Sequence, residues 1–356
     1  MIGRLRAVLV ALVVIALWAA ASVLARTAHH ERVERAALAM AAGTAAVGAG
    51  RGTEAVALLR DAVALDPQRP EYRLALGKAL FVVGRLEEAE PYVYEVLRRT
   101  PVDGESNLVL ARILARQGNQ AEAESAYYRA IYGRWSTAAQ PLRRQARLEL
   151  IALYRSQGAT ARLRAALLEL SNAFPGDREL QLQAGRDLLA AGFADDAARQ
   201  LRLIDERFAD PGRAPVLLAR AEFARRHYVE AYEASGRALV RLAADPEAAA
   251  IHALSARVLS LDPDQPRLSP ARRAARLRAL LTDVHRRLGA CGEADGPEAA
   301  RLLATLTRWL ARRGSDVEVG RSLLQAAATR WATTCPAASE TDAAGRVLTD
   351  LATDLP

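Results

Sequence analysis

The chain has few of the residues that usually carry catalysis or bind metals. Its 356 residues include two cysteines, five histidines and a single lysine, and aromatic residues make up only 5%. No HExxH, GxSxG, DxDxDG or CxxC motif occurs, and Gly77-Lys78 lacks the other residues of a phosphate-binding loop. These absences argue against the common metalloprotease, serine hydrolase, calcium, zinc and nucleotide sites. We therefore predict that the chain is not an enzyme and has no metal or cofactor.

Positive charge is abundant but comes almost entirely from arginine. The formal net charge is +8 and the pI is about 10.0, which raises nucleic acid or an anionic surface as partners. The arginines are spread along the whole sequence among aspartate and glutamate, and no nucleic-acid-binding motif is present. We do not expect nucleic acid to be the partner.

What the chain does have is a repeated pattern, clearest in residues 70–101. This stretch predicts two amphipathic helices, separated by Gly84 and ended by Pro101. Pro101 follows Pro67 by 34 residues, and the same interval separates Gly50, Gly84 and Gly118. Small residues recur at one position of the first helix and at one of the second: Gly43, Gly77 and Ala111, and Ala55, Ala89 and Ala123.

The period and the small residues resemble those of the tetratricopeptide repeat (TPR) family. The next turn glycine, Gly158, follows Gly118 by 40 residues, which indicates a six-residue insertion near residues 133–141. We predict six repeats over residues 36–245, with units starting at Ala36, Pro70, Gly104, Arg144, Arg178 and Gly212. The resemblance implies an all-α, right-handed α-solenoid whose first helices line a concave groove for protein partners.

The first 26 residues contain an uncharged segment, Ala7–Ala25, preceded by Arg4 and Arg6. Nineteen helical residues span about 28 Å, close to the thickness of a bilayer core. We predict an uncleaved transmembrane helix over residues 1–26, with a linker over residues 27–35; a cleaved signal peptide is the alternative. On this basis we expect a single-pass protein of a bacterial inner membrane with its soluble part in the periplasm.

The last third, residues 246–356, predicts a helical C-terminal cap with degenerate repeats that continues the stack. Its helices are expected at residues 271–288, 297–313, 315–333 and 341–351. Cys291 and Cys335 both lie there, each at the end of a predicted helix. In an exported chain they would form a disulfide, and two buried free thiols are the alternative.

The period also predicts a binding groove. The residue after the small position of the first helix is Lys78, Arg112, Ala152, Arg186 and Arg220 in successive repeats, and in TPR proteins this position faces the groove. Phe81 and Phe223 follow three residues after two of these cations. A column of cations would bind an acidic or carboxylate-ended peptide. The competing interpretation is that an arginine-rich chain places arginine on any wet helix face.

A second candidate surface is the aromatic cluster of Tyr127, Tyr128, Tyr132 and Trp135, in which the spacing places Tyr127, Ile131 and Trp135 on one helix face. We expect it to pack against the insertion, and a hot spot for a partner is the alternative. Together these features predict a membrane-anchored scaffold that assembles an envelope complex, for secretion, polysaccharide export or cytochrome maturation. The alternatives are a cytoplasm-facing recruitment factor and a non-catalytic regulatory subunit of an enzyme complex. A further rival is an enzyme with unrecognised chemistry near His285.

Overall fold

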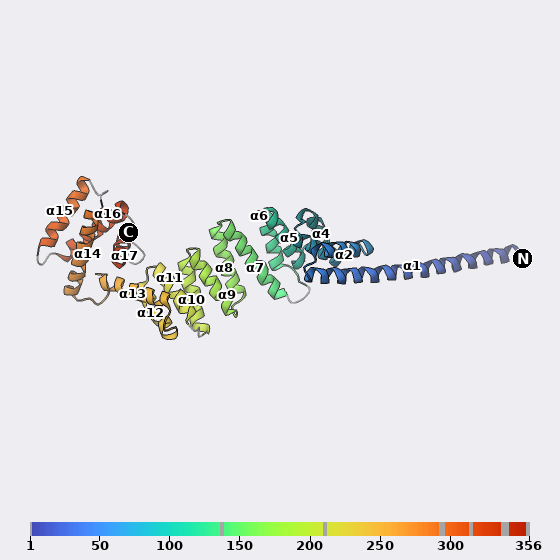
Figure 1. Cartoon of the computed structure of the whole chain (residues 1–356), viewed down its shortest axis with the longest axis horizontal. Coiled ribbons are helices and arrows are strands. Elements are labelled where there is room, and N and C mark those ends of the chain that lie inside the picture. The colour runs from blue at the N-terminus through green and yellow to red at the C-terminus, as the bar shows by residue number, and fades with distance from the viewer. Residues whose placement is uncertain are drawn as a thin grey trace. The chain divides into compact units, whose positions relative to one another are not determined.

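The structure is a computed structural model that describes residues 2–135, 139–208, 212–291, 296–312, 316–335 and 342–353, apart from the side chains of residues 2–16, 139 and 353. Within these ranges the chain forms seventeen α-helices and no β-strand (Figure 1). The all-α prediction is confirmed. The chain divides into two compact units, residues 1–166 and residues 167–356.

The first unit consists of helix pairs. The helices are α1 (Ile2–Gly48), α2 (Gly52–Leu65), α3 (Pro70–Val82), α4 (Leu86–Arg99), α5 (Gly104–Gln117), α6 (Gln120–Tyr132), α7 (Ala139–Ser156) and α8 (Thr160–Ala173), the last of which crosses into the second unit. Helices α1 and α2, α3 and α4, and α5 and α6 pack as sequential pairs, and each pair also contacts the next helix in the chain. This neighbour-to-neighbour packing is that of a repeat array.

The second unit continues with two further pairs and then a group of longer helices. The pairs are α9 (Arg178–Ala190) with α10 (Ala194–Phe208) and α11 (Arg213–Ala224) with α12 (Tyr228–Arg241). The remaining helices are α13 (Pro246–Leu261), α14 (Pro270–Ala290), α15 (Pro297–Ala311), α16 (Val317–Thr334) and α17 (Ala343–Thr353).

The turns inside the pairs explain the 34-residue spacing of glycine. Gly50, Gly84, Gly118, Gly158 and Gly192 have φ angles of 73°, 80°, 84°, 63° and 85°. Glycine adopts this left-handed conformation without the steric cost of a Cβ atom. In the sixth pair the equivalent residue, 34 positions after Gly192, is Arg226, and its φ is 65°. The turn geometry is thus kept where the glycine is lost.

The small residues of the repeat allow the paired helices to approach closely. A Cβ atom on Gly43 would lie 2.6 Å from Leu59, one on Gly77 would lie 2.8 Å from Val93, and one on Gly185 would lie 2.8 Å from Leu201. The partner positions in the second helices are buried alanines at 55, 89, 123, 197 and 231. A larger side chain at the glycines would separate the pair, so the pattern that predicts the repeat is also what holds it together.

The transmembrane prediction for Ala7–Ala25 is wrong. In the part of the chain that the structure describes, no helix has a stretch long and apolar enough to cross a membrane. Residues 7–16 of the predicted segment lie outside the described side chains. From Leu17 onward only nine residues precede Arg26, and α1 then continues through charged positions to Gly48. The single-pass inner-membrane location that we inferred from this segment is therefore also wrong.

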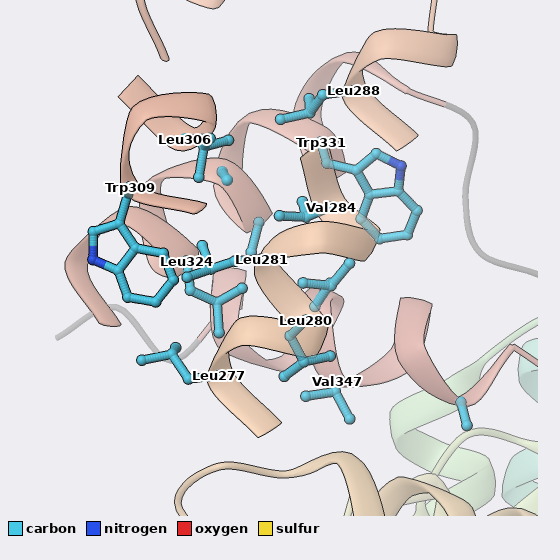
Figure 2. Close-up of a cluster of buried hydrophobic side chains, with 14 of the residues drawn as sticks. Leu277, Leu280, Leu281, Val284, Leu288, Leu306, Trp309, Leu324, Trp331 and Val347 are labelled. Carbon is cyan, nitrogen blue, oxygen red and sulfur yellow. The ribbon is translucent and has the colours of Figure 1, made fainter. Parts of the chain in front are cut away.

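The C-terminal helices have a core of their own, built from larger side chains than those of the repeats. Figure 2 shows Leu281 and Val284 of α14 among the side chains of the neighbouring helices, with Trp309 of α15 and Trp331 of α16 at its edges. Helix α14 contacts α15, α16 and α17, and α17 also packs against α13. One central helix with several partners differs from the sequential pairing of the repeats.

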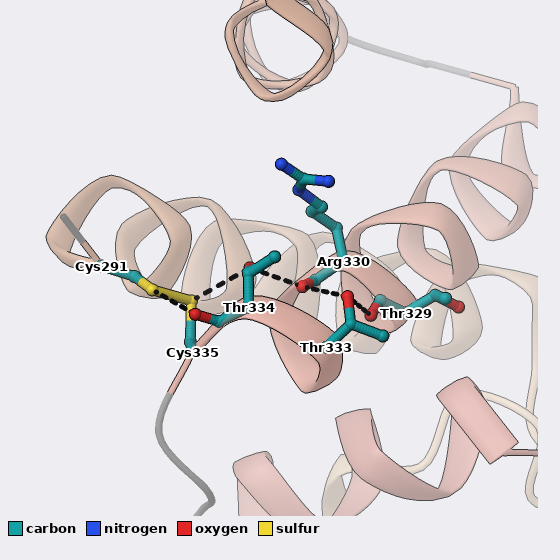
Figure 3. Close-up of a disulfide and its surroundings, with 6 residues drawn as sticks. All are labelled: Cys291, Thr329, Arg330, Thr333, Thr334 and Cys335. Carbon is teal, nitrogen blue, oxygen red and sulfur yellow. Dashed lines mark hydrogen bonds between the residues drawn. A yellow bond between two sulfur atoms is a disulfide. The ribbon is translucent and has the colours of Figure 1, made fainter. Parts of the chain in front are cut away.

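A disulfide joins Cys291, just after α14, to Cys335, just after α16 (Figure 3). Their Cα atoms are 5.8 Å apart, and neither cysteine is free. The carbonyl oxygen of Thr334 lies 3.5 Å from the Cys291 sulfur, so the bond sits directly on the last turn of α16. The bond fixes the ends of the two helices that form most of the C-terminal core.

Candidate peptide-binding surface

The predicted column of cations lies on the first helices of the pairs. Lys78 is on α3, Arg112 on α5, Arg186 on α9 and Arg220 on α11, and Ala152 takes the equivalent place on α7. Lys78 and Arg112 are half-buried, whereas Arg186 and Arg220 are exposed. Equal positions in the repeat therefore lead to different environments in the two units.

In the first unit both cations are neutralised by a glutamate from the next repeat. Lys78 forms an ion pair with Glu105 at the start of α5. Arg112 binds Glu149 of α7 through two guanidinium nitrogens, with Nε 2.9 Å from Oε2 and Nη2 2.8 Å from Oε1. Bidentate pairs of this kind are among the strongest charge-assisted hydrogen bonds. These cations connect repeats and are not available to a peptide.

Two aromatic residues complete these contacts. The hydroxyl of buried Tyr127 donates to Glu149 Oε2 at 3.2 Å. Burial raises the pKa of Tyr127 well above its usual range, and the nearby Glu149 carboxylate adds to the shift. Phe81 is covered by Arg116, whose guanidinium carbon lies 4.1 Å from the ring centre. Phe81, a predicted groove residue, thus belongs to the contact between α3 and α5.

In the second unit the cations form weaker contacts with neighbouring side chains. Arg220 Nη1 lies 3.5 Å from Glu247 Oε1, and both side chains are about half exposed, at 58% and 46%. Arg186 donates one hydrogen bond, from Nη1 to Gln183 Oε1 at 3.0 Å. In the described residues of this unit, no carboxylate forms an ion pair with Arg186. The cations that remain free to bind a ligand are therefore those of the last two predicted repeats.

Arg220 and Phe223 line one cavity, with a volume of about 620 Å³. Its walls come from α11 and α13, which are separated by one helix, and from the much later helix α17. The lining residues are Arg220, Phe223, Ala224, Ala250, Ile251, Ala253, Leu254, Arg257 and Arg346. The lining thus combines apolar side chains with three arginines, one of which lies over Phe223, and such a lining fits an apolar side chain next to a carboxylate.

Phe223 is held at the cavity by two aromatic and cationic contacts. Its ring lies 5.3 Å from that of Tyr228 in an edge-to-face arrangement, and the Arg346 guanidinium carbon lies 4.7 Å from the ring centre. Such contacts fix the ring and leave less side-chain freedom to lose on binding. The floor of the cavity is therefore preorganised.

The helices around the cavity are positioned by local sequence signals and by one long-range contact. Helix α13 starts at Pro246, and the side chain of Asp245 caps it by accepting from Ala248 N at 2.8 Å. Helix α17 is attached through Asp350, which accepts from the Tyr228 hydroxyl at 2.6 Å and pairs with Arg226 at 2.9 Å. Burial raises the pKa of Tyr228, so its hydroxyl keeps the proton that it donates to Asp350.

Sequence reasoning missed several residues of this surface. Arg257 lies 34 residues after Phe223, so extending the period by one unit would have reached it, whereas Arg346 lies in a much later helix to which the period does not point. Glu105 and Glu247 could have been found, because each is the second residue of the unit that follows its cation and is 27 positions away. A search for opposite charges between successive units would have identified both pairs.

The aromatic cluster at the insertion packs as a structural element. Helix α6 ends at Tyr132, so Trp135 does not share a helix face with Tyr127 and Ile131. The Trp135 indole donates to Ala130 O at 3.0 Å and covers Gly104, the first residue of α5. Residues 136–138 of the predicted insertion lie outside the described residues. Tyr128 and Tyr132 stack with ring centres 6.5 Å apart, and Tyr132 is 65% exposed.

The remaining candidates for chemistry do not assemble into a site. In the described part of the chain no group of three histidine, cysteine, aspartate or glutamate side chains could hold a metal ion. His285 Nε2 lies 2.9 Å from the Thr307 hydroxyl on exposed surface, and no described cavity includes it. That the chain is not an enzyme stays a prediction.

Comparison with known proteins supports the repeat assignment. Residues 40–103 and 74–139 match the sequence profile of the tetratricopeptide repeat. No curated protein sequence matches the chain. Among solved structures, MamA is 20% identical, covering 49% of this chain and 91% of its own, with a TM-score of 0.39. PilF of Pseudomonas aeruginosa is 15% identical, covering 63% and 99%, with a TM-score of 0.41.

A third solved structure, YrrB, is described as a TPR protein with an unusual peptide-binding site. It is 15% identical, covering 54% of this chain and 95% of its own, with a TM-score of 0.38. Likenesses this distant carry no argument about function. The profile match and the helix pairs agree that residues 40–139 carry tetratricopeptide repeats.

Proposed function

We propose that this chain is a non-catalytic TPR scaffold that binds an acidic segment of a protein partner, with one apolar side chain of that segment in the cavity between α11, α13 and α17. The observation that carries the proposal is that cavity, because Phe223, Ile251 and Leu254 form its floor while Arg220 and Arg257 lie at its edge. The predicted role in an envelope complex depended on the membrane segment and loses that support.

The floor accounts for the apolar part of the ligand. Full burial of a leucine or phenylalanine side chain contributes about 1.5–3 kcal/mol, which corresponds to about a tenfold to hundredfold gain in affinity. Ile251 and Leu254 are only partly buried in the free protein, so a ligand would cover apolar surface that is now exposed to water.

The rim accounts for the acidic part. Arg220 is only loosely paired with Glu247, and Arg257 is exposed. A carboxylate entering here would receive charge-assisted hydrogen bonds from planar guanidinium groups. A basic ligand would meet the same cations unfavourably, so the surface selects by charge as well as by shape.

The test measures binding of fluorescent ten-residue peptides that carry one leucine or phenylalanine among aspartate and glutamate residues. We expect Phe223→Ala and Arg257→Glu in the full chain each to weaken binding of the peptides at least tenfold. Phe81→Ala is the matched control, because Phe81 holds the same repeat position and also packs against an arginine but does not line this cavity. It should leave binding within about threefold of the unmodified chain.

Peptides with amides in place of the acids, or with serine in place of the apolar residue, should bind at least tenfold more weakly. Circular dichroism of each variant shows whether its helices are intact. Absence of binding by the acidic peptides, or equal loss in Phe81→Ala and Phe223→Ala, would refute the proposal.

A further inference from the structure

The ion pairs between repeats follow a rule of position. In the pairs Lys78–Glu105 and Arg220–Glu247, the glutamate is the second residue of the next unit, and each pair is separated by 27 positions. Arg112 is an exception to this spacing, because its partner Glu149 lies 37 positions away and is the sixth residue of the next predicted unit. Three of the four cations in the column are thus matched by a glutamate from the following repeat.

The remaining cation breaks this rule. The residue 27 positions after Arg186 is Arg213, the first residue of α11. Helices α9 and α11 pack against each other, so this pair of positions corresponds to a cation with its glutamate in the other repeats. Here the residues at both positions, 186 and 213, are arginines. The glutamate that would neutralise Arg186 is therefore missing.

Nearby carboxylates neutralise the charges of Arg186 and Arg213 only weakly. Arg213 Nη1 lies 3.9 Å from Glu179 Oε2, and the same glutamate is 3.8 Å from Arg178. Asp187 accepts a hydrogen bond from Gln183 Nε2 at 3.0 Å, and Gln183 Oε1 accepts one from Arg186. Arg186 and Arg213 are both exposed, so a ligand can reach them.

We propose that a carboxylate side chain of the partner occupies the position between Arg186 and Arg213 and replaces the missing glutamate. Each guanidinium can donate two parallel hydrogen bonds to a carboxylate, and binding would relieve the repulsion between the two cations. This inference rests on the proposed function, because it assigns a second contact to the same acidic segment.

The two contacts together define a spacing in the ligand. Arg220, at the rim of the cavity, follows Arg186 by 34 positions, which is one repeat. Packed helices lie roughly 10 Å apart, and an extended chain advances roughly 3.3 Å per residue. Arg213 also lies ten residues, roughly 15 Å, before Phe223 on α11, so the partner segment carries an aspartate or glutamate about three to five residues from its large apolar residue, in either order.

Arg213→Glu tests the site directly, because it creates the ion pair that the other repeats already have. We expect this variant to bind the acidic peptide at least tenfold more weakly than the unmodified chain, while its melting temperature stays the same or rises. A peptide whose acid at the predicted spacing is replaced by glutamine should bind both proteins equally. Glu105→Gln, which frees Lys78 in the other unit, is the matched control and should leave binding unchanged.

A charge swap gives the complementary result. The double variant Arg186→Glu/Arg213→Glu should bind a peptide with lysine in place of that acid at least tenfold better than the unmodified chain does. If Arg213→Glu binds the acidic peptide as tightly as the unmodified chain while Phe223→Ala does not, the carboxylate site is refuted and the proposed function stands. If the unmodified chain binds none of the acidic peptides, both fail.

Discussion

The cations of the first unit and those of the second hold equal places in the repeat but have different surroundings. Lys78 and Arg112 are half-buried and paired with glutamates of the next repeat, and Arg112 is bound through two nitrogens. Arg186 and Arg220 are exposed, and the first of them faces the position of another arginine. Burial and the residue opposite in the following repeat together separate the two situations, because Arg220 has a glutamate opposite it but is exposed.

The comparison shows that a repeat signature alone does not identify a binding residue. A cation at the groove position connects repeats when it is half-buried and tightly paired with a glutamate of the next repeat, as Lys78 and Arg112 are, and it is accessible to a ligand when it is exposed and weakly paired or unmatched, as Arg220 and Arg186 are. Stability and binding should therefore separate along the chain, and substitutions can test this in order of decreasing effect on stability.

The largest effect is expected for Arg112→Ala. This change leaves Glu149 three-quarters buried without its cation, because the two side chains are each only 26% exposed. We expect the free energy of unfolding to fall by about 2 kcal/mol, measured by urea denaturation. Arg116→Ala, on the same helix but in an exposed position, is the control and should cost less than about 1 kcal/mol. Peptide binding should not change. A binding defect would contradict the idea that the cations of the first unit stabilise the fold and those of the second unit bind the ligand.

A pH effect is expected at the same contact. The folded chain keeps the Tyr127 proton because burial raises its pKa, whereas the unfolded chain loses it near pH 10. This group therefore contributes nothing to the pH dependence below that value, and stability falls as the pH rises above it, by at most about 1.4 kcal/mol per pH unit. The difference in unfolding free energy between the unmodified chain and Tyr127→Phe should shrink between pH 9 and pH 11. A constant difference would show that Tyr127 ionises equally in both states.

Lys78→Ala should have a smaller effect than Arg112→Ala. The two partners of the Lys78–Glu105 pair are 41% and 39% exposed, and solvent weakens such pairs. We expect a loss below about 1 kcal/mol that shrinks further at 1 M salt. Thermal unfolding at low and high salt measures it, and a loss as large as that of Arg112→Ala would be inconsistent with the difference in burial.

Arg186→Ala should have the smallest effect on stability. The side chain is exposed and donates one hydrogen bond to a neighbour on its own helix, so the change should stay within about 0.5 kcal/mol. Its effect should appear in binding, where the acidic peptide loses at least fivefold in affinity. If Arg186→Ala strongly destabilised the chain, Arg186 would stabilise the fold as Lys78 and Arg112 do, and the difference between the two units would be refuted.

The sequence predicts the repeat region well because one spacing encodes both turns and packing. Pro70, Gly104 and Arg178 begin helices at the predicted residues, and the predicted turn glycines have positive φ angles. The sixth turn was harder to find, since Arg226 adopts the same conformation without being glycine. The spacing of glycines therefore reveals a left-handed turn only where the turn contains a glycine.

The candidate site could be predicted only in part. Arg220 and Phe223 follow from the period, but Arg346 belongs to a helix more than a hundred residues later, and its position depends on contacts such as Tyr228 with Asp350. The transmembrane prediction rested on one local signal, the uncharged run Ala7–Ala25. In the part of α1 that the structure describes, no stretch is long and apolar enough to span a membrane.

The disulfide has a mechanical consequence. Because Cys291 and Cys335 are covalently joined, a force applied to the two ends of the chain passes from one sulfur to the other and does not load α15 or α16, which lie between them. The separation of 44 residues corresponds to about 150 Å of extended chain that stays folded back under tension. In a single-molecule pulling experiment, adding a reductant should lengthen the fully extended molecule by roughly this amount.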